Sequence, residues 1–229
     1  MYASLDLIRL PLGPAQRELA RVSRRDFAAG ASFSRLLLPI RLESMPWPVP
    51  LVRTVGFFAV WPDLGAVERF RTGPLRPWTA AKEHLALTLR PLQSFGTWSG
   101  GDPLDGPHAD PGPGPVLLLT HSRTRLRRVP VFAATDGPVV RSLRRAEGQI
   151  WATGFMDGVR SNDTGTLSLW RSSADATRFA YAPGVHQDAV KAQRRGGWFS
   201  ESWFARFALS EASGSWRGLE APAMPAGAT

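Results

Sequence analysis

Short segments of the chain alternate between apolar and polar residues or are continuously apolar, and both patterns are typical of β-strands. In the first half these segments are "ASLDLIRL" (3–10), "LVRTVGFFAVW" (51–61) and "HLALTLRPLQSF" (84–95). We therefore expect strands throughout both halves. The strand segments of the second half are "PVLLLTHSR" (115–123), "QIWATGFM" (149–156), "GTLSLW" (165–170) and "SWFARFALS" (202–210).

The segments between these strands have the composition and spacing of amphipathic helices. Pro14 near the start and Gly30 after the end suit a helix within 13–30. Pro138 weakens the helical prediction for 131–148, because proline has no amide hydrogen to donate. The remaining predicted helices are 63–73, 173–181 and 183–195.

The predicted elements follow the order β-α-β-β-α-β twice, which is the order of the ferredoxin-like or split-βαβ unit. Each such unit has a sheet with helices on one face only, so the other face of the sheet needs cover. We therefore predict an α+β fold in which two fused ferredoxin-like (βαββαβ) halves form an α/β barrel.

Two blocks of sequence recur in the same order in both halves, which favours an internal duplication. "FAVWPDLGAVERF" (58–70) aligns with "LSLWRSSADATRF" (167–179), and "GTWSG" (96–100) aligns with "GSWRG" (214–218). The second pair of blocks is more widely separated than the first, which indicates an insertion in the second copy. The matched aromatic residues are Trp61 with Trp170, Phe70 with Phe179, and Trp98 with Trp216.

A Gly/Pro-rich stretch divides the chain into two nearly equal parts, and its composition excludes a helix or a central strand. We predict a first ferredoxin-like half at 1–98, a linker or surface loop at 99–115, and a second half at 116–229. His108 lies in the linker and is expected to be solvated.

The composition is that of a soluble globular protein, and it removes several chemistries. The chain has 229 residues and no cysteine, so it has no disulfide, thiolate zinc site, iron–sulfur cluster or cysteine nucleophile. No apolar run is long enough to span a membrane, and the N-terminus lacks the pattern of a secretory signal. We expect a cytoplasmic protein that makes at most peripheral contact with a membrane.

The formal net charge is +9, and nearly all of the basic residues are arginines. They are scattered, with the densest run at "RTRLRR" (123–128), so we do not expect a nucleic-acid-binding protein. A basic surface of this kind suits the docking of an acidic electron-transfer partner.

His186 lies within the predicted helix 183–195, on a face of small and mostly apolar residues. Small residues beside a histidine would let a flat macrocycle approach the helix. Spacing alone fits a hydrogen-bonded structural histidine better than a ligand. The duplication does not explain the histidine, because Pro77 occupies the equivalent position of the first half. The predicted face consists of Ala182, His186, Ala189, Val190 and Gln193, and the aromatic residues that could wall a pocket near it are Trp170, Phe179, Trp198, Phe199, Trp203 and Phe204.

The chain resembles the spheroidene monooxygenase (carotenoid ketolase) family of haem-binding dimeric α/β-barrel proteins. The segments that carry the resemblance are "AVWPD" (59–63), "LSLW" (167–170), "FAY" followed by His186, "WFSESWFARF" (198–207) and "GSWRG" (214–218).

The resemblance implies haem b, dioxygen, an apolar polyene substrate and electrons from a ferredoxin-type donor. It also implies that His186 is the proximal ligand of the haem iron. Arginines suit haem propionates, and Arg123 and Arg125 on the first strand of the second half are our candidates, with simple solvation as the alternative.

Two segments depart from the family pattern, and we expect both near the pocket. "THS" (120–122) stands where the family has "TRA", so His121 replaces an arginine. "GFMD" (154–157) stands where the family tends to carry "GxGE", which places Met156 and Asp157 there. His121 is an alternative distal hydrogen-bond donor or ligand, and His84 is expected to be structural.

Three functions remain open at this point. The first is a haem-dependent monooxygenase that acts on an apolar, carotenoid-type metabolite. The second is a haem-binding barrel of other chemistry, such as a dehydratase or a haem-degrading enzyme. The third is a barrel without cofactor that serves as a binding module or as a cofactor-free oxygenase.

Overall fold

The computed structural model describes residues 1–10, 27–42, 49–51, 53–79, 83–105, 112–158 and 162–223. The helix predicted within 13–30 lies largely outside these ranges, and His108 lies wholly outside them. No helix in the described ranges is long and apolar enough to cross a membrane.

Eight antiparallel strands form a closed barrel, in the order β4-β1-β3-β2-β6-β7-β5-β8, with β8 pairing back to β4. A short strand β9 (Leu219–Glu220) extends the sheet beside the end of β8. The barrel strands are β1 (Tyr2–Arg9), β2 (Phe33–Ile40), β3 (Thr54–Trp61), β4 (Glu83–Gly96), β5 (Val116–Thr124), β6 (Gln149–Asp157), β7 (Asp163–Trp170) and β8 (Phe199–Trp216).

The two halves of the barrel repeat one strand arrangement. The order is β4-β1-β3-β2 in the first half and β6-β7-β5-β8 in the second, and each is the order of a ferredoxin-like unit. Pairing of β2 with β6 and of β4 with β8 joins the halves into one closed sheet. The predicted α+β fold of two fused ferredoxin-like halves is therefore confirmed.

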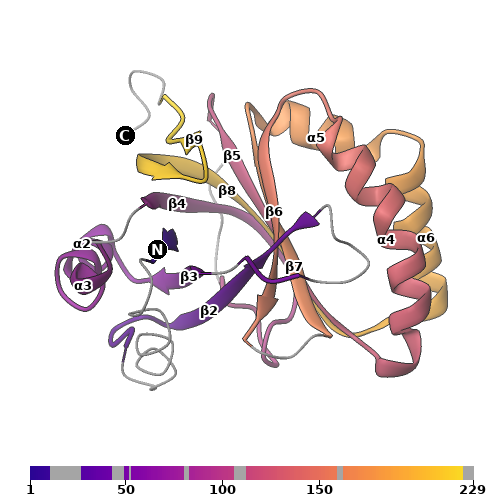
Figure 1. The fold of residues 1–229 in the computed structure, drawn as a ribbon, viewed down its shortest axis with the longest axis horizontal. Helices are drawn as coiled ribbons and strands as arrows, with labels where there is room; N and C mark the ends of the chain where they lie inside the picture. The colour runs from indigo at the N-terminus through magenta and orange to yellow at the C-terminus, as the bar shows by residue number, and fades with distance from the viewer. Residues whose placement is uncertain are drawn as a thin grey trace.

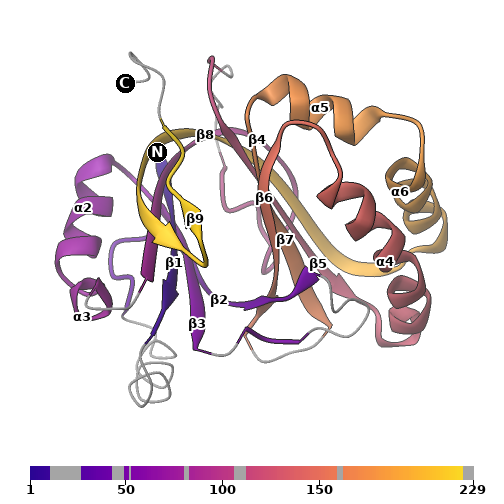
Figure 2. The ribbon, with the colours of Figure 1, turned by 45° about the horizontal axis from the view of Figure 1, so that its top comes forward.

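Helices cover the outer face of the barrel at two opposite ends of the molecule (Figure 1). Of the helices in the described residues, α2 (Leu64–Thr72) and α3 (Arg76–Thr79) lie beside the first half, and α4 (Val129–Arg144), α5 (Ser173–Tyr181) and α6 (Val185–Gly196) lie beside the second (Figure 2). The 3₁₀ turn η2 (Leu126–Arg128) leads into α4.

The sequence repeat reappears as a repeat of packing. Trp61 at the end of β3 contacts Phe70 of α2, with ring centroids 5.0 Å apart. Trp170 at the end of β7 contacts Phe179 of α5 in the same way, at 5.2 Å. The two helices also begin alike, because a side-chain oxygen of the preceding residue accepts a backbone N–H bond in both.

The second copy differs from the first in the helix that follows. The four-residue α3 contains Pro77, and the twelve-residue α6 occupies the equivalent place in the second half. The insertion predicted from the sequence therefore lengthens the element that carries His186.

The structure differs from two local predictions. The strand β2, "FSRLLLPI", was not predicted, because its apolar residues do not alternate and it contains a proline. The helix predicted within 131–148 is present as α4, and it runs through Pro138 without interruption since its apolar face packs against the sheet. Pro183 does not lie in the first turn of α6, which begins after Gly184.

The barrel interior is packed with apolar side chains from the strands of both halves. Trp98 and Trp203 are each 1% exposed and pack against each other within it, with ring centroids 5.5 Å apart. Part of the predicted linker also belongs to this core: Leu104 is 1% exposed, and Asp102 accepts a hydrogen bond from Trp203 Nε1 at 2.8 Å. The described part of 99–115 therefore packs onto the barrel.

Gly165 of β7 marks a place where the strands allow no side chain. A Cβ atom there would collide with the backbone oxygen of Thr120 and with the ring of Phe155. We expect Gly165→Ala to lower the free energy of unfolding by about 2–3 kcal/mol, because a backbone oxygen cannot move aside. Chemical denaturation measures this change. Gly101→Ala, where a Cβ would meet nothing within 4 Å, is the control; equal losses would contradict the prediction.

A candidate cofactor cavity between α4 and α6

A cavity of about 120 Å³ lies between α4 and α6, on the outer side of the second half of the barrel. His186, Ala189, Val190 and Gln193 line it from α6, which is the face predicted from their spacing. Ala182 does not belong to this face, because it ends α5 and is exposed. The other lining residues are Phe132, Thr135, Asp136 and Val139 of α4, together with Trp198 and Phe199.

The aromatic residues expected around the histidine divide into two groups. Trp198 and Phe199 line the cavity, and the ring of Phe179 lies 4.9 Å from the ring of His186. Phe204 packs into the outer core beneath the helices. Trp203, by contrast, points into the barrel.

Burial keeps the imidazole of His186 neutral. Burial lowers the pKa of His186 below its usual range, and a weaker effect, a hydrogen bond with the backbone of Ala180, acts in the opposite direction. Among the described residues, no group completes a well-formed hydrogen bond to the buried Nδ1 atom. A neutral imidazole in the wall of a cavity has the chemistry of a metal ligand.

Asp136 of α4 is a second titratable group in the cavity wall. Burial raises its pKa from 3.8 to about 6. Nothing in the local sequence distinguishes Asp136 from a solvated helix carboxylate, so it was not predicted. The cavity thus places a carboxyl group with a raised pKa beside an imidazole with a lowered one.

The raised pKa of Asp136 predicts a loss of stability as the pH rises. Between about pH 4 and pH 6 the folded protein holds a proton that the unfolded chain has released, so the free energy of unfolding falls across this window. Asp136→Asn should remove that decline. Denaturation of the parent protein and of Asp136→Asn at several pH values tests this prediction. The difference between their free energies of unfolding reports on Asp136 alone, because His186 is present in both. A difference independent of pH would contradict the assignment.

The two predicted propionate partners lie in different environments. Arg123, on β5, donates to Asp163 from Nε at 2.9 Å and pairs with Glu201 at 3.2 Å. Arg125 lies just after β5, not on it, and is exposed. Its Nε donates to the carbonyl of Phe199 at 3.2 Å, so it borders the cavity.

His121 lies inside the barrel and away from the cavity. It is 2% exposed and stacks on Trp98, with ring centroids 4.4 Å apart. Its Nε2 atom is 2.5 Å from Asp163 Oδ1. His84 is also engaged, with Nε2 2.9 Å from Asp6 Oδ1, which fits the structural role expected for it.

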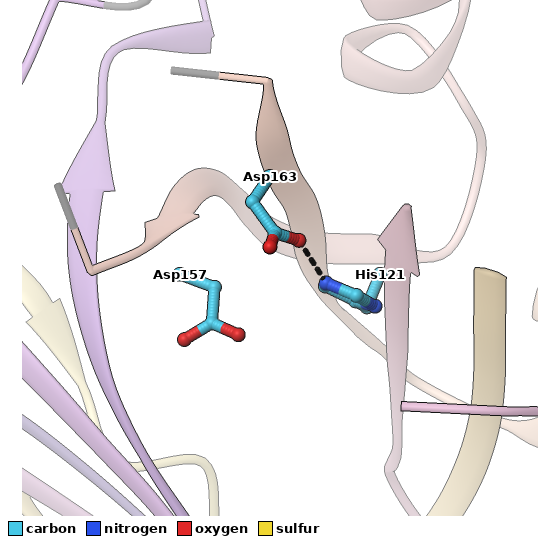
Figure 3. A group of neighbouring side chains, drawn as sticks. All are labelled: His121, Asp157 and Asp163. Carbon is cyan, nitrogen blue, oxygen red and sulfur yellow. Dashed lines mark hydrogen bonds and ion pairs between the residues drawn. The ribbon is translucent and has the colours of Figure 1, made fainter. Parts of the chain in front are cut away.

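The two departures from the family pattern, His121 and Asp157, meet in the barrel interior (Figure 3). Together with Asp163 they bring three ligand-type atoms within 4.8 Å of one another. Asp157 accepts from Trp98 Nε1 at 2.8 Å and pairs with Arg35 at 3.3 Å. Because both carboxylates already have arginine partners, this group fits a charge-balanced hydrogen-bond network better than a cation site.

The two carboxyl groups of this network respond differently to their surroundings. Burial raises the pKa of Asp157, and its bonds to Trp98 and Arg35 only partly offset this. Burial acts the same way on Asp163, but hydrogen bonds from His121 and Arg123 outweigh it and hold the pKa of Asp163 below its usual range. His121 and Asp157, which we expected near the cofactor pocket, therefore belong to the network inside the barrel.

No protein-family model matches the chain. It is 32% identical over 146 residues to the spheroidene monooxygenase of Rhodobacter capsulatus, covering 62% of this chain and 60% of that protein. It is 27% identical over 177 residues to the spheroidene monooxygenase of Cereibacter sphaeroides, covering 76% of this chain and 54% of that protein. The chain is therefore similar in sequence to two spheroidene monooxygenases. The resemblance expected from its sequence is thereby confirmed.

The chain spans between 54% and 60% of the length of these two spheroidene monooxygenases. Among solved structures, an aldoxime dehydratase has a similar fold, with a TM-score of 0.57, 12% identity, and coverage of 92% of this chain and 81% of that one. A second aldoxime dehydratase, in complex with butyraldoxime, gives a TM-score of 0.55 at 10% identity, with coverage of 91% and 79%. At these identities the likeness concerns the fold alone.

Proposed function

We propose that this relative of the spheroidene monooxygenases is a haem-dependent monooxygenase that oxidises an apolar, carotenoid-type metabolite. His186 would be the ligand of the haem b iron. The observation that carries the proposal is a neutral imidazole, without a well-formed hydrogen bond at Nδ1, on a small-residue helix face in an apolar cavity. The two named relatives supply the type of reaction and substrate.

The side chains that line the cavity suit haem, but the cavity is too small to hold it without a movement of the helices. Ala189 and Val190 leave space beside the imidazole, and Trp198 and Phe199 supply apolar walls. A cavity of about 120 Å³ is smaller than the roughly 300–1,000 Å³ of common ligand sites. Haem binding would therefore require α4 and α6 to move apart.

Bound haem would supply activation of dioxygen, while the protein holds, orients and shields the cofactor. His186 would fix it through an imidazole that burial keeps unprotonated. Trp198 and Phe199 would exclude water. Arg125, exposed at the edge of the cavity, is available to a propionate, whereas Arg123 would have to share its guanidinium with Asp163 and Glu201. Asp136 could deliver a proton within the cavity.

The proposed reaction also needs dioxygen and electrons. An acidic, ferredoxin-type donor is the partner that suits a chain with a net charge of +9. Haem-loaded protein supplied with reductant, dioxygen and a carotenoid should give an oxygenated product, detected by chromatography and mass spectrometry. Haem binding without product would favour the dehydratase or haem-degrading alternative. Failure to bind haem would favour the cofactor-free barrel and contradict the proposal.

A further inference from the structure

An exposed corner of mixed apolar and basic residues lies where β5 passes into α4. Leu126, in the 3₁₀ turn η2, exposes 77% of its surface, and Val131 of α4 exposes 43%. Exposed Arg125 and Arg127 flank Leu126 in the sequence. Leu126, Val129 and Val131 together form an exposed apolar cluster, and clusters rimmed by polar residues are typical of interaction surfaces.

The C-terminal end of α6 reaches the same corner. Helices α4 and α6 pack against each other (Figure 2). The backbone N–H of Arg125 donates to the carbonyl of Trp198, two residues after the end of α6, at 2.9 Å. Arg194 and Arg195 in the last turn of α6 are exposed and add to the positive charge there. In the described part of the chain, none of these four arginines pairs with a carboxylate.

This corner adjoins the cavity. Phe132 of α4 and Phe199 of β8 both line the cavity and contact each other, with ring centroids 5.6 Å apart. Arg125 bonds to the carbonyl of Phe199. Whatever surface covers the corner therefore lies next to the α4–α6 cavity.

We propose that the corner formed by Arg125, Leu126, Arg127, Val131 and the end of α6 docks the protein on an anionic lipid bilayer. The guanidinium groups of Arg127, Arg194 and Arg195 bind lipid phosphates, and Leu126 and Val131 enter the interfacial region. The combination favours lipid over an acidic protein surface, because an exposed leucine at the tip of a turn gains most from a layer that it can penetrate. The docking itself does not depend on haem, whereas delivery of an apolar substrate from the bilayer rests on the proposed function.

Sedimentation of the full chain with vesicles tests the docking. The vesicles contain phosphatidylcholine alone or phosphatidylcholine with phosphatidylglycerol, and we expect strong binding only to the second kind. Each arginine near such a surface contributes about fivefold to partitioning, so Arg127→Gln with Arg195→Gln should weaken binding about 25-fold. Leu126→Ser should weaken it about tenfold.

The matched control is Arg141→Gln with Arg145→Gln, which removes the same charge at the opposite end of α4. Retained binding by this control, together with loss in the corner variants, supports the proposal. Equal loss in both double variants would show attraction by net charge alone and overturn it. Failure of the parent chain to bind anionic vesicles also overturns it, and capture of an acidic ferredoxin through these residues would then assign the corner to a protein partner. Thermal melting of each variant confirms that it is folded.

Discussion

Replacement of Asp163 by alanine is expected to lower the free energy of unfolding by about 3–5 kcal/mol. Asp163 is 3% exposed and is the shared acceptor of His121 and Arg123. Its loss leaves the imidazole of His121, which is 2% exposed, without its acceptor, and leaves the partly exposed guanidinium of Arg123 with Glu201 as its remaining carboxylate partner. Unpaired buried polar groups of this kind are among the costliest single changes in a folded protein.

Denaturant unfolding of Asp163→Ala measures this loss. Glu68→Ala, on the exposed side of α2, removes a carboxylate that has no ion pair in the described structure, and should change the stability by no more than about 0.5 kcal/mol. Asp163→Asn should fall between the two, since an amide oxygen still accepts a hydrogen bond but carries no charge. A loss in Asp163→Ala as small as that in Glu68→Ala would mean that the network does not hold the barrel interior together.

Replacement of Ala189 by tryptophan is expected to abolish haem binding while the barrel stays folded. Ala189 lies one helical turn from His186 and lines the cavity. An indole there would occupy the space beside the imidazole that a flat macrocycle needs. Because Ala189 is only partly buried, the added side chain can turn toward solvent in the absence of haem.

Ala192→Trp is the matched control for this variant. Ala192 is an exposed residue of the same helix and does not line the cavity, so the same change in size should leave haem affinity unaltered. Absorption titration with haem compares the two proteins. Equal haem binding by Ala189→Trp and Ala192→Trp would place any haem site elsewhere.

Local patterns in the sequence were sufficient for most of the elements, β2 excepted, and for the duplication. The equivalence of Trp61 with Trp170, and of Phe70 with Phe179, predicted two packing arrangements that the structure contains at closely similar distances. Helical spacing likewise placed His186 and Ala189 on one face, because residues three and four apart are neighbours on any helix.

Tertiary contacts decided what the sequence could not predict. The continuation of α4 through Pro138 depends on packing against the sheet, which outweighs one lost hydrogen bond. Asp102, Asp157 and Asp163 act on residues distant in the chain, so only the closed barrel brings them to Trp203, Trp98 and His121. The raised pKa of Asp136 arises from burial between two helices, which no local pattern encodes.

The most direct test of the account is titration of the full chain with haem, followed by the Soret band, in the parent protein and in His186→Ala and His121→Ala. The account predicts that the parent and His121→Ala bind one haem each with a ligated-iron spectrum, and that His186→Ala loses this band. An unchanged Soret band in His186→Ala would contradict the claim that the imidazole in the α4–α6 cavity holds the iron.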